Sequence, residues 1–373
     1  MLRILELFGG IGACSKALER LGIDYEIADY VEIDKYAVKS FNAIHGTNFE
    51  PQDITEWDKD IDVDLIMHGS PCQDFSVAGR GAGGDEGSGT RSSLMYEAIR
   101  IVEKLKPKYV IWENVKNLLS KKHRHNFDAY QETMENLGYT SYYQVLNAKD
   151  YGIPQNRERV FTVSIREDIA KKRYLRSATA MAIFEFPEPM PLEKKLKDML
   201  EDEVDEKYYL NDKLLKTYQR NFGSKGKETY SNECKLLGRV EGINGHDCLK
   251  RVYSAEGVSP TVSTCQGGNT EPKIIASRGR GPNNEQQLEP RKDGLTNTIT
   301  SVQKDNYLEK DYRIRKLTPK ECWRLMGFDD SDFEKAQQVN SNTQLYKQAG
   351  NSIVVNVLEA ILKELCKEAE AYV

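Results

Sequence analysis

The sequence predicts an α/β fold built on a doubly wound, mostly parallel sheet, with a smaller domain that is irregular and β-rich. Short apolar runs alternate with segments of helical periodicity over residues 2–165, which is typical of parallel strands joined by helices. After about residue 170 this alternation ends, and residues 205–310 are rich in Gly, Thr, Ser and Asn. A chain of 373 residues also exceeds one average domain. We therefore expect one domain from residues 1–180 and 311–373, and another from residues 185–310.

Local signals predict the elements of the larger domain in order. Six strands are expected, over Arg3–Phe8, Tyr25–Val31, Leu65–Met67, Tyr109–Trp112, Tyr142–Leu146 and Val160–Ile165. Helices are expected between them, over Ala13–Leu21, Tyr36–His45, Leu94–Leu105 and Phe127–Leu137. Gly22 ends the first of these helices and Pro107 follows the third. Two later helices are expected, one opened by a capping box at Thr318–Glu321 and the other over Ile353–Leu365.

Two segments of the smaller domain resemble each other. Residues 257–264 (GVSPTVST) and 294–301 (GLTNTITS) each begin with a turn signal and continue as a β-branched run. The match is short, so they are either related strand-turn units or unrelated threonine-rich strands. Pro187, Pro189 and Pro191 lie in a charged stretch, which indicates a boundary before this domain.

Composition limits the class of protein. With 39% hydrophobic and 30% charged residues, the chain has enough apolar material for a packed core. No apolar run is long enough to span a bilayer, and the N-terminus has a strand pattern rather than that of a signal peptide. The seven cysteines include no C-x-x-C pair, which argues against a zinc site and a disulfide framework. We expect a cytoplasmic monomer with no metal and no membrane partner.

The net charge of −5 gives no direct indication of nucleic-acid binding. Basic residues nevertheless cluster at 121–125, 171–176 and 278–292, whereas residues 185–206 are mostly acidic. Each basic cluster fits a local binding groove or an ordinary solvated surface about equally well.

One cysteine lies where an open α/β sheet binds its ligands. The buried-strand pattern Asp64–Met67 leads into G-S-P-C-Q-D-F-S, which contains Cys72. That position makes Cys72 a candidate nucleophile. An isolated cysteine is more often a small buried hydrophobe, so the assignment depends on the other motifs.

A second group of residues predicts a nucleoside site. The small residues of Phe8–Gly12 lie between the first strand and the first helix, where the backbone can approach a ligand. Glu32 ends the second strand, where an acid can bind ribose hydroxyls, and Asp53 is expected at a third strand end within reach of an adenine amino group. There is no dedicated phosphate clamp. S-adenosyl-L-methionine, which has a ribose and an adenine but no phosphate, therefore fits better than NAD.

Charged residues at two further strand ends complete the candidate site. Glu113 follows the strand Tyr109–Trp112, so it faces the same crevice as Cys72 or is an exposed loop acid. Arg157 and Arg159 precede the last strand, and alternation places them on one face. Two guanidinium groups there bind a carbonyl oxygen or form surface ion pairs.

Six motifs follow one another in a definite order along the chain. They are F-G-G-I-G at Phe8, G-S-P-C-Q at Gly69, E-N-V at Glu113, Q-N-R-E-R at Gln155, R-K-L-T-P-K-E-C-W-R-L-M-G-F at Arg315 and Q-A-G-N-S-I at Gln348. By these motifs the chain resembles the DNA cytosine-5 methyltransferase family over residues 2 to about 362. Arg251–Ser254 and Thr261 are similar to the end of that family's target-recognition domain. The segment 294–301 looks like an insertion, and the turn before Arg251 departs from the pattern.

The resemblance implies a class I, Rossmann-like methyltransferase whose smaller domain recognises double-stranded DNA. It implies that Cys72 adds to C6 of a flipped cytosine, while Glu113 contacts N3, Arg159 holds O2 and Arg157 supports the site. The implied cofactor-binding residues are Phe8, Gly10, Gly12, Glu32, Asp53, Ile54, Pro71, Asn351 and Ser352. The implied DNA-binding residues are Ser76, Arg91, Arg251 and Thr261. The glycine-rich loop at 79–89 is expected to close over the DNA.

Other functions stay open at this point. A tRNA cytosine-5 methyltransferase of the same fold would use the same cysteine and glutamate, although the sizeable 185–310 region favours DNA. Intact Cys72, Glu113, Arg157 and Arg159 argue against a catalytically silent homologue that only binds DNA. A dehydrogenase explains the glycine-rich turn but neither Pro71-Cys72 nor the C-terminal motifs. The recognition sequence, the methylated cytosine and the existence of a cognate restriction endonuclease do not follow from the sequence.

Overall fold

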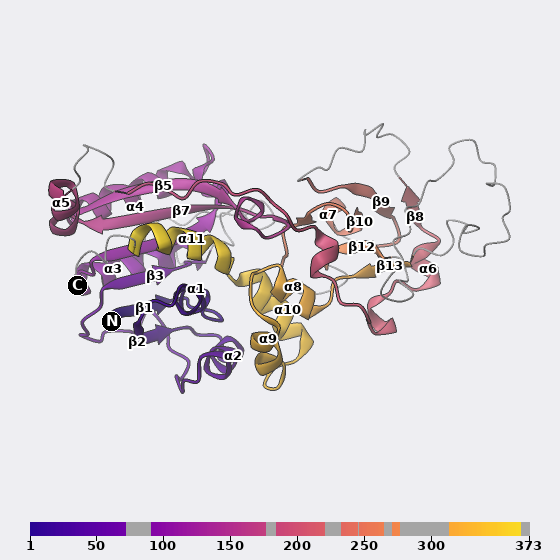
Figure 1. Cartoon of the computed structure of the whole chain (residues 1–373), viewed down its shortest axis with the longest axis horizontal. Helices are drawn as coiled ribbons and strands as arrows, with labels where there is room; N and C mark the ends of the chain where they lie inside the picture. Colours follow the sequence, from indigo (N-terminus) through magenta and orange to yellow (C-terminus); the bar gives the residue numbers. More distant parts are fainter. Residues whose placement is uncertain are drawn as a thin grey trace.

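The computed structural model describes residues 1–71, 91–176, 184–220, 233–244, 246–264, 271–276 and 313–366. Cys72, Ser76, the loop at 79–89 and the segment 294–301 lie outside these ranges. Figure 1 shows two lobes, a larger one that contains both chain ends and a smaller one built from the middle of the chain.

A six-stranded sheet forms the centre of the larger lobe, in the order β2-β1-β3-β4-β7-β5. The strands are β1 (Leu2–Leu7), β2 (Tyr25–Val31), β3 (Leu65–His68), β4 (Tyr109–Val115), β5 (Tyr139–Asn147) and β7 (Glu158–Arg166). The first four run parallel, and β7 is antiparallel to both of its neighbours. The predicted α/β fold with a mostly parallel sheet is therefore confirmed.

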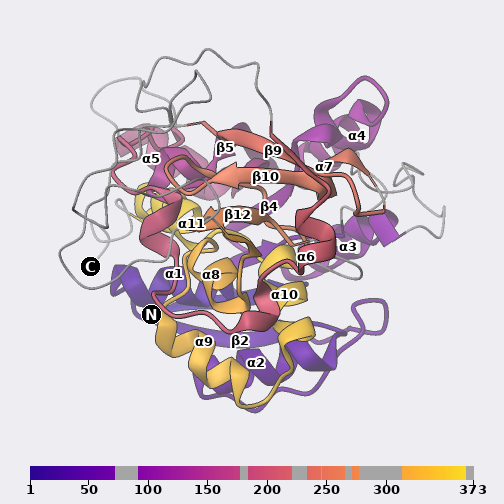
Figure 2. The ribbon, with the colours of Figure 1, turned by 90° about the vertical axis from the view of Figure 1, so that its right-hand side faces the viewer.

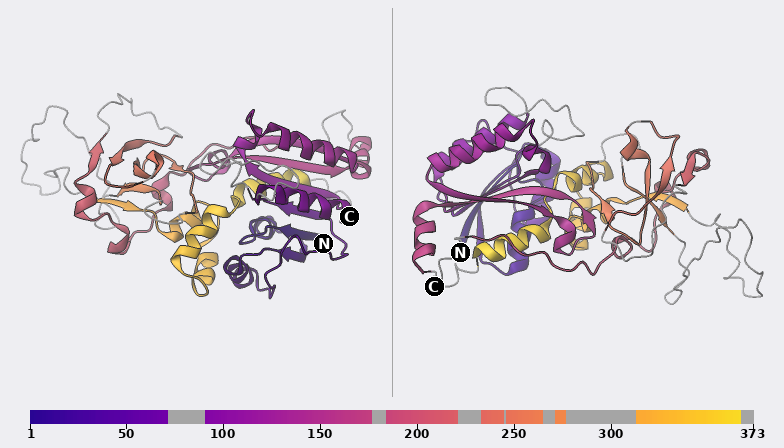
Figure 3. Two further views of the ribbon diagram at one scale, coloured as in Figure 1. Left: turned by 180° about the vertical axis from the view of Figure 1, so that it is seen from behind. Right: turned by 90° about the horizontal axis from the view of Figure 1, so that it is seen from above.

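Helices cover both faces of this sheet, because its strands are apolar on both sides. The helices are α1 (Ala13–Leu21), α2 (Lys35–His45), α3 (Met95–Leu105), α4 (Arg124–Asn136), α5 (Glu167–Arg176) and α11 (Val355–Cys366). Alternate residues of β1 separate the two cores: Ile4 packs with α1 and α11, whereas Leu5 packs with α3 and α4. Figure 3 (right) shows the sheet between these two layers.

Three further helices connect the two lobes. They are α8 (Pro319–Arg324), α9 (Asp330–Gln337) and α10 (Asn342–Asn351), and α9 and α10 lie against α2 (Figure 2). The predicted capping box at the start of α8 is confirmed, since Thr318 and Glu321 each accept the other's backbone N–H. Glu321 also forms two hydrogen bonds with Arg315, at 2.8 and 2.7 Å, in a fully buried ion pair.

The smaller lobe contains a five-stranded sheet in the order β13-β12-β10-β9-β8. Its elements are β8 (Tyr218–Arg220), β9 (Leu236–Val240), β10 (Arg251–Ser254), β12 (Lys273–Ala276) and β13 (Arg313–Lys316), with the short helices α6 (Asp212–Leu215) and α7 (Asp247–Lys250). Its own core includes Val240, Val252 and Ile314. The predicted division, with the smaller domain over residues 185–310, stays a prediction. Of the residues near its two ends, β13 pairs within the smaller sheet, whereas Leu196 and Met199 pack into the core of the larger lobe.

A two-stranded ladder joins the lobes. In it, β6 (Gln155–Asn156) of the larger lobe pairs in parallel with β11 (Ser259–Pro260), which belongs to the first of the two similar threonine-containing segments. Short 3₁₀ helices complete the structure, over Arg91–Leu94, Lys116–Leu119, Ala148–Tyr151, Leu196–Met199 and Glu206–Tyr208.

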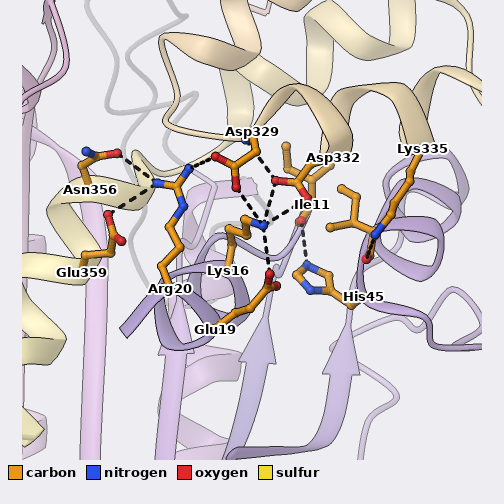
Figure 4. A network of polar contacts seen from close by, with 11 residues as sticks. Ile11, Lys16, Glu19, Arg20, His45, Asp329, Asp332, Lys335, Asn356 and Glu359 are labelled. Carbon is orange, nitrogen blue, oxygen red and sulfur yellow. Dashed lines mark hydrogen bonds and ion pairs between the residues drawn. The ribbon is translucent and has the colours of Figure 1, made fainter. Parts of the chain in front are cut away.

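A network of charges fastens α1 to α9 and α11 (Figure 4). The Lys16 ammonium, only 5% exposed, lies 3.1 Å from carboxylate oxygens of Glu19, Asp329 and Asp332. On the next turn of α1, Arg20 pairs with Asp329 at 2.6 Å and with Glu359 at 3.5 Å. Because α1 begins at the predicted cofactor turn, this network also holds that turn in place.

Replacing Lys16 with methionine is expected to lower the free energy of unfolding by about 3–5 kcal/mol, because the buried Asp332 then loses its cationic partner. Urea denaturation of the full chain measures this change. The control is Lys171→Met, which removes an exposed pair with Glu167 and is expected to cost less than about 0.5 kcal/mol. Equal losses in the two variants would contradict the role assigned to Lys16.

Candidate active site

The turn from β1 into α1 has the backbone of a ligand-binding turn. Phe8, Gly10 and Gly12 all have positive φ angles, of 53°, 55° and 80°. Phe8 is the informative one, since a bulky residue in the left-handed region indicates strain of the kind that concentrates at functional sites. A Cβ on Gly12 would lie 2.2 Å from His45 Nε2, so only glycine fits there.

Glu32 is held beside this turn at the end of β2. Its carboxylate accepts the backbone N–H of Gly10 at 3.1 Å and that of Asp34 at 2.8 Å. Burial raises the pKa of Glu32, and these two hydrogen bonds oppose the rise. The carboxylate is thus oriented by the backbone, and oxygen lone pairs are left over for ribose hydroxyls.

Asp53 follows Gln52, whose backbone bonds to Glu32, but the expectation that Asp53 lies at a strand end is wrong. It lies in a turn between α2 and β3, where its side chain accepts the N–H and the hydroxyl of Thr55. Aspartate favours this turn because its short side chain bonds the backbone two residues on. Gln52 N donates to Glu32 O at 2.9 Å and so brings Asp53 and Ile54 next to the end of β2.

A pocket of about 370 Å³, counting its open mouth, lies where these elements meet. It is lined by Glu6, Leu7, Phe8, Gly9, Gly10, Ala13, Cys14, Met67, Gly69, Asn351, Ser352 and Ile353. The structure thus brings together four predicted cofactor residues: Phe8, Gly10, Asn351 and Ser352. The other predicted cofactor residues do not line the pocket: Glu32, Asp53, Ile54, Pro71 and Gly12. Gly12 instead allows the left-handed backbone of the turn. Asn351 and Ser352 reach the pocket from the end of α10, just before α11 packs against α1.

Glu6 is a pocket residue that the sequence reasoning missed. It is a fully buried carboxyl in β1 that accepts the N–H of Ser15 at 3.0 Å and the Ser15 hydroxyl. Burial raises the pKa of Glu6 to about 7. The available signal was an acid in the middle of an otherwise apolar strand, L-R-I-L-E-L.

The raised pKa of Glu6 predicts a pH effect on stability. Between its ordinary pKa of 4.5 and about 7, the folded state binds the proton more tightly than the unfolded chain, so unfolding becomes easier as pH rises. Glu6→Gln removes this slope. The free energy of unfolding of the variant minus that of wild type is expected to rise by about 3 kcal/mol from pH 4.5 to pH 8, because each unit of pKa shift corresponds to 1.36 kcal/mol. Urea denaturation of both proteins at the two pH values tests this, and a pH-independent difference would contradict it.

Glu113 lies at the end of β4, paired with an arginine of the antiparallel neighbour β7. Its Oε1 is 3.1 Å from Arg159 Nε. Burial raises the pKa of Glu113, and the charges of Arg159 and Arg157 oppose the rise. Glu113 Oε2 lies 3.7 Å from the position that a Cβ on Gly69 would occupy, so the carboxyl faces the end of β3. Glu113 thus lies beside Gly69, three residues before Cys72, and its proximity to Cys72 itself stays a prediction.

The end of β3 is pinned to β4 by side chains that the sequence did not single out. Trp112 Nε1 donates to Ser70 Oγ at 2.9 Å, and Asn114 Nδ2 donates to Ser70 O at 3.3 Å. Ser70, two residues before Cys72, is therefore held beside the strand that carries Glu113. Asn114 belongs to the E-N-V motif, and this bond gives a physical reason for an amide next to the glutamate.

The expectation that Arg157 and Arg159 share a strand face is wrong. Arg157 lies between β6 and β7, where it is 4% exposed and donates to the carbonyl oxygens of Val262, Gly350 and Ser352. Alternation applies only within a continuous strand, and the chain leaves the β11 ladder here before joining β5. Arg159 alone of the two pairs with Glu113 in the described structure.

The residues predicted to contact DNA are dispersed. Arg251 lies in β10 and forms two hydrogen bonds to Asp247, at 3.0 and 2.9 Å. Thr261 lies at the junction of the lobes, where its hydroxyl donates to Asn156 O at 2.7 Å. Arg91 starts a 3₁₀ helix before α3, and Ser76 lies outside the described ranges. Within those ranges there is no cluster of three His, Cys, Asp or Glu side chains for a metal, and no helix long and apolar enough to cross a membrane.

Comparison with known proteins gives one consistent result. The family model for C-5 cytosine-specific DNA methylase matches residues 2–367. The orphan methyltransferase M.SPBetaI of Bacillus phage SPbeta is 37% identical, over 98% of this chain and 97% of the phage protein. The type II methyltransferase M.HhaI of Haemophilus parahaemolyticus is 33% identical, over 96% of this chain and 93% of that protein.

Solved structures agree at the level of the fold. The DNMT2 structure from Spodoptera frugiperda matches with a TM-score of 0.63 at 20% identity, over 98% of this chain and 99% of that one. A protein described as a "putative DNA modification methyltransferase" encoded within an E. coli prophage matches with a TM-score of 0.60 at 19% identity, over 99% of this chain and 100% of that one. The motifs, the sheet order and the near-complete family match lead to the same conclusion: this chain belongs to the C-5 cytosine-specific DNA methylase family.

Proposed function

We propose that the chain transfers a methyl group from S-adenosyl-L-methionine to C5 of a cytosine flipped out of a specific short duplex DNA sequence. The observation that supports this best is the largely buried pair of Glu113 and Arg159 beside Gly69. An acid and a guanidinium at this point can bind N3 and O2 of one pyrimidine ring. Cys72 follows Pro71 directly in the chain.

In this mechanism the Cys72 thiolate forms a bond to C6 of the cytosine. Glu113 hydrogen-bonds or protonates N3, and Arg159 holds O2, so the electrons displaced from the C5–C6 double bond make C5 nucleophilic. The bound cofactor supplies an electrophilic methyl group to C5. A base then removes the C5 proton, the bond from C6 to sulfur breaks, and the C5–C6 double bond returns.

The residues around the pocket fit the cofactor. Gly10, where a Cβ would meet no atom of the described residues within 4 Å, leaves the backbone open to a ligand, whereas Gly9 has no room for a side chain because a Cβ there would lie 2.6 Å from the buried Tyr30 ring. Glu32 is oriented for ribose hydroxyls, with Asp53 and Ile54 next to it for the adenine. Asn351 and Ser352 line the pocket, and Pro71 directly precedes Cys72 in the chain. The side chain of Ile33, 66% exposed beside Glu32, gives the adenine an apolar surface.

The partner in this proposal is double-stranded DNA, which the family match favours, and the target base leaves the stack to reach Cys72. Ser76, Arg91, Arg251 and Thr261 are the proposed DNA-contacting residues, and the loop at 79–89 closes over the duplex. The smaller lobe reads the sequence. The protein acts as a monomer, either alone or beside a cognate restriction endonuclease.

The test is methyl transfer from radiolabelled S-adenosylmethionine to unmethylated duplex DNA and, in parallel, to tRNA. Bisulfite sequencing of the DNA product then locates the protected cytosines. We expect label in DNA, at cytosines within one short motif. Label in tRNA instead would overturn the DNA substrate, and no label in either, despite cofactor binding, would overturn the activity.

A further inference from the structure

The segment Thr261–Thr264 leaves the ladder between the lobes and is fixed to the larger lobe by one side chain and by its backbone. The Thr261 hydroxyl donates to Asn156 O, Val262 N donates to Gln155 Oε1 at 3.0 Å, and Val262 O accepts from Arg157 Nη1 at 3.1 Å. Val262 is fully buried in the large core. We refer to Gln155–Arg157, Thr261–Thr264 and Gly350–Ser352 together as the seam.

The opposite side of the seam is a wall of the cofactor pocket. Arg157 Nη2 donates to Gly350 O at 3.1 Å and to Ser352 O at 2.8 Å. Gly350 is packed so closely on the segment Thr261–Thr264 that a Cβ would lie 2.3 Å from the backbone of Ser263 and Thr264. Asn351 and Ser352, the next two residues, line the pocket. The Arg157 guanidinium thus holds both the backbone at Val262, which follows the ladder to the smaller lobe, and the backbone at Gly350 and Ser352, next to the pocket.

We propose that Arg157 is a positioning residue that couples cofactor binding to DNA recognition through this seam. The inference rests on the proposed function. A ligand in the pocket contacts Asn351–Ser352, and DNA on the smaller lobe acts on the segment at 261–264. Because both segments share the Arg157 guanidinium and the Gly350 contact, a ligand that favours one position of either segment also favours the matching position of the other. Linkage makes the effect reciprocal, so each ligand tightens the other by the same factor.

The experiment measures the affinity for S-adenosylhomocysteine by isothermal titration calorimetry, without DNA and with a saturating duplex that carries the methylated motif. The ratio of the two affinities is the readout, since a merely structural change lowers both affinities together. The wild-type protein is expected to show a ratio of about fivefold or more, in the usual range of coupling between sites. In Arg157→Lys, which keeps the charge but loses the planar fork, the ratio is expected to fall below about twofold.

Two further variants make the result decisive. Thr261→Val removes one seam hydrogen bond from an exposed side chain and is expected to lower the ratio in the same direction, which covers the case in which Arg157→Lys fails to fold. Arg324→Lys is the matched control, because Arg324 also donates to two backbone carbonyls, of Met199 and Leu200, away from the seam. Its ratio is expected to equal that of wild type.

A wild-type ratio of one, or an unchanged ratio in both seam variants, would overturn the proposal. These outcomes differ from failure of the proposed function, which appears as an absence of methyl transfer to any DNA. The coupling is judged only on a duplex that the wild-type protein methylates.

Discussion

Replacing Cys72 with alanine is expected to abolish methyl transfer, with a loss on the order of 10⁴-fold or more, as in other enzymes that lose an essential nucleophile. Without a thiolate at C6, C5 of cytosine stays too weak a nucleophile to accept the methyl group. Binding of S-adenosylhomocysteine is expected to persist, because the described pocket is lined by the β1 turn, β3 and α10. Single-turnover transfer of labelled methyl to the target duplex measures the loss.

A duplex with 5-fluorocytosine at the target position sharpens this test. Fluorine at C5 cannot leave as the proton does, so the wild-type protein is expected to stay covalently bound to the DNA, and Cys72→Ala is not. The exposed Cys248 is the control, since Cys248→Ala leaves the proposed site intact and is expected to keep wild-type turnover. Residual transfer by Cys72→Ala near the wild-type rate would exclude the covalent route.

Replacing Glu113 with glutamine is expected to lower kcat by about 10²–10⁴-fold, the usual contribution of a positioned acid. Glutamine keeps the size of the side chain but cannot give N3 a proton or balance the charge of Arg159, which lies 3.1 Å away. The KM for the cofactor is expected to stay near its wild-type value, because the amide remains beside the pocket without lining it. Steady-state kinetics on the target duplex separates the two constants.

The pH profile gives Glu113→Gln a second readout. Burial raises the pKa of Glu113, so the wild-type enzyme is expected to lose rate as pH rises through that pKa and the acid deprotonates. The rate of the glutamine variant is expected not to fall over this pH range. The control is Glu158→Gln, which removes an exposed carboxylate that pairs with Lys116 and directly precedes Arg159 in the chain. A loss in Glu158→Gln equal to that in Glu113→Gln would mean that local charge, not the acid at N3, sets the rate.

Most of the architecture of the larger lobe could be predicted from the sequence. Its strands and helices are marked by short-range signals, such as the apolar run before Gly69, the left-handed Gly22 after α1 and the capping box at Thr318. These signals act over a few residues, so they are readable without the fold. The two-residue strand β6 was not predicted, because it exists only through its pairing with β11.

By itself the sequence determined the order of the elements of the larger lobe, the glycine-rich turn at Phe8–Gly12 and the family. Only the tertiary structure decided what Arg157, Glu6 and Lys16 do. Arg157 bonds to Gly350, 193 positions away, and Lys16 to Asp332, 316 positions away. The pKa of Glu6 depends on burial that no neighbour in sequence reveals. Partners and burial of this kind arise when distant segments pack together, and local periodicity contains no information about that packing.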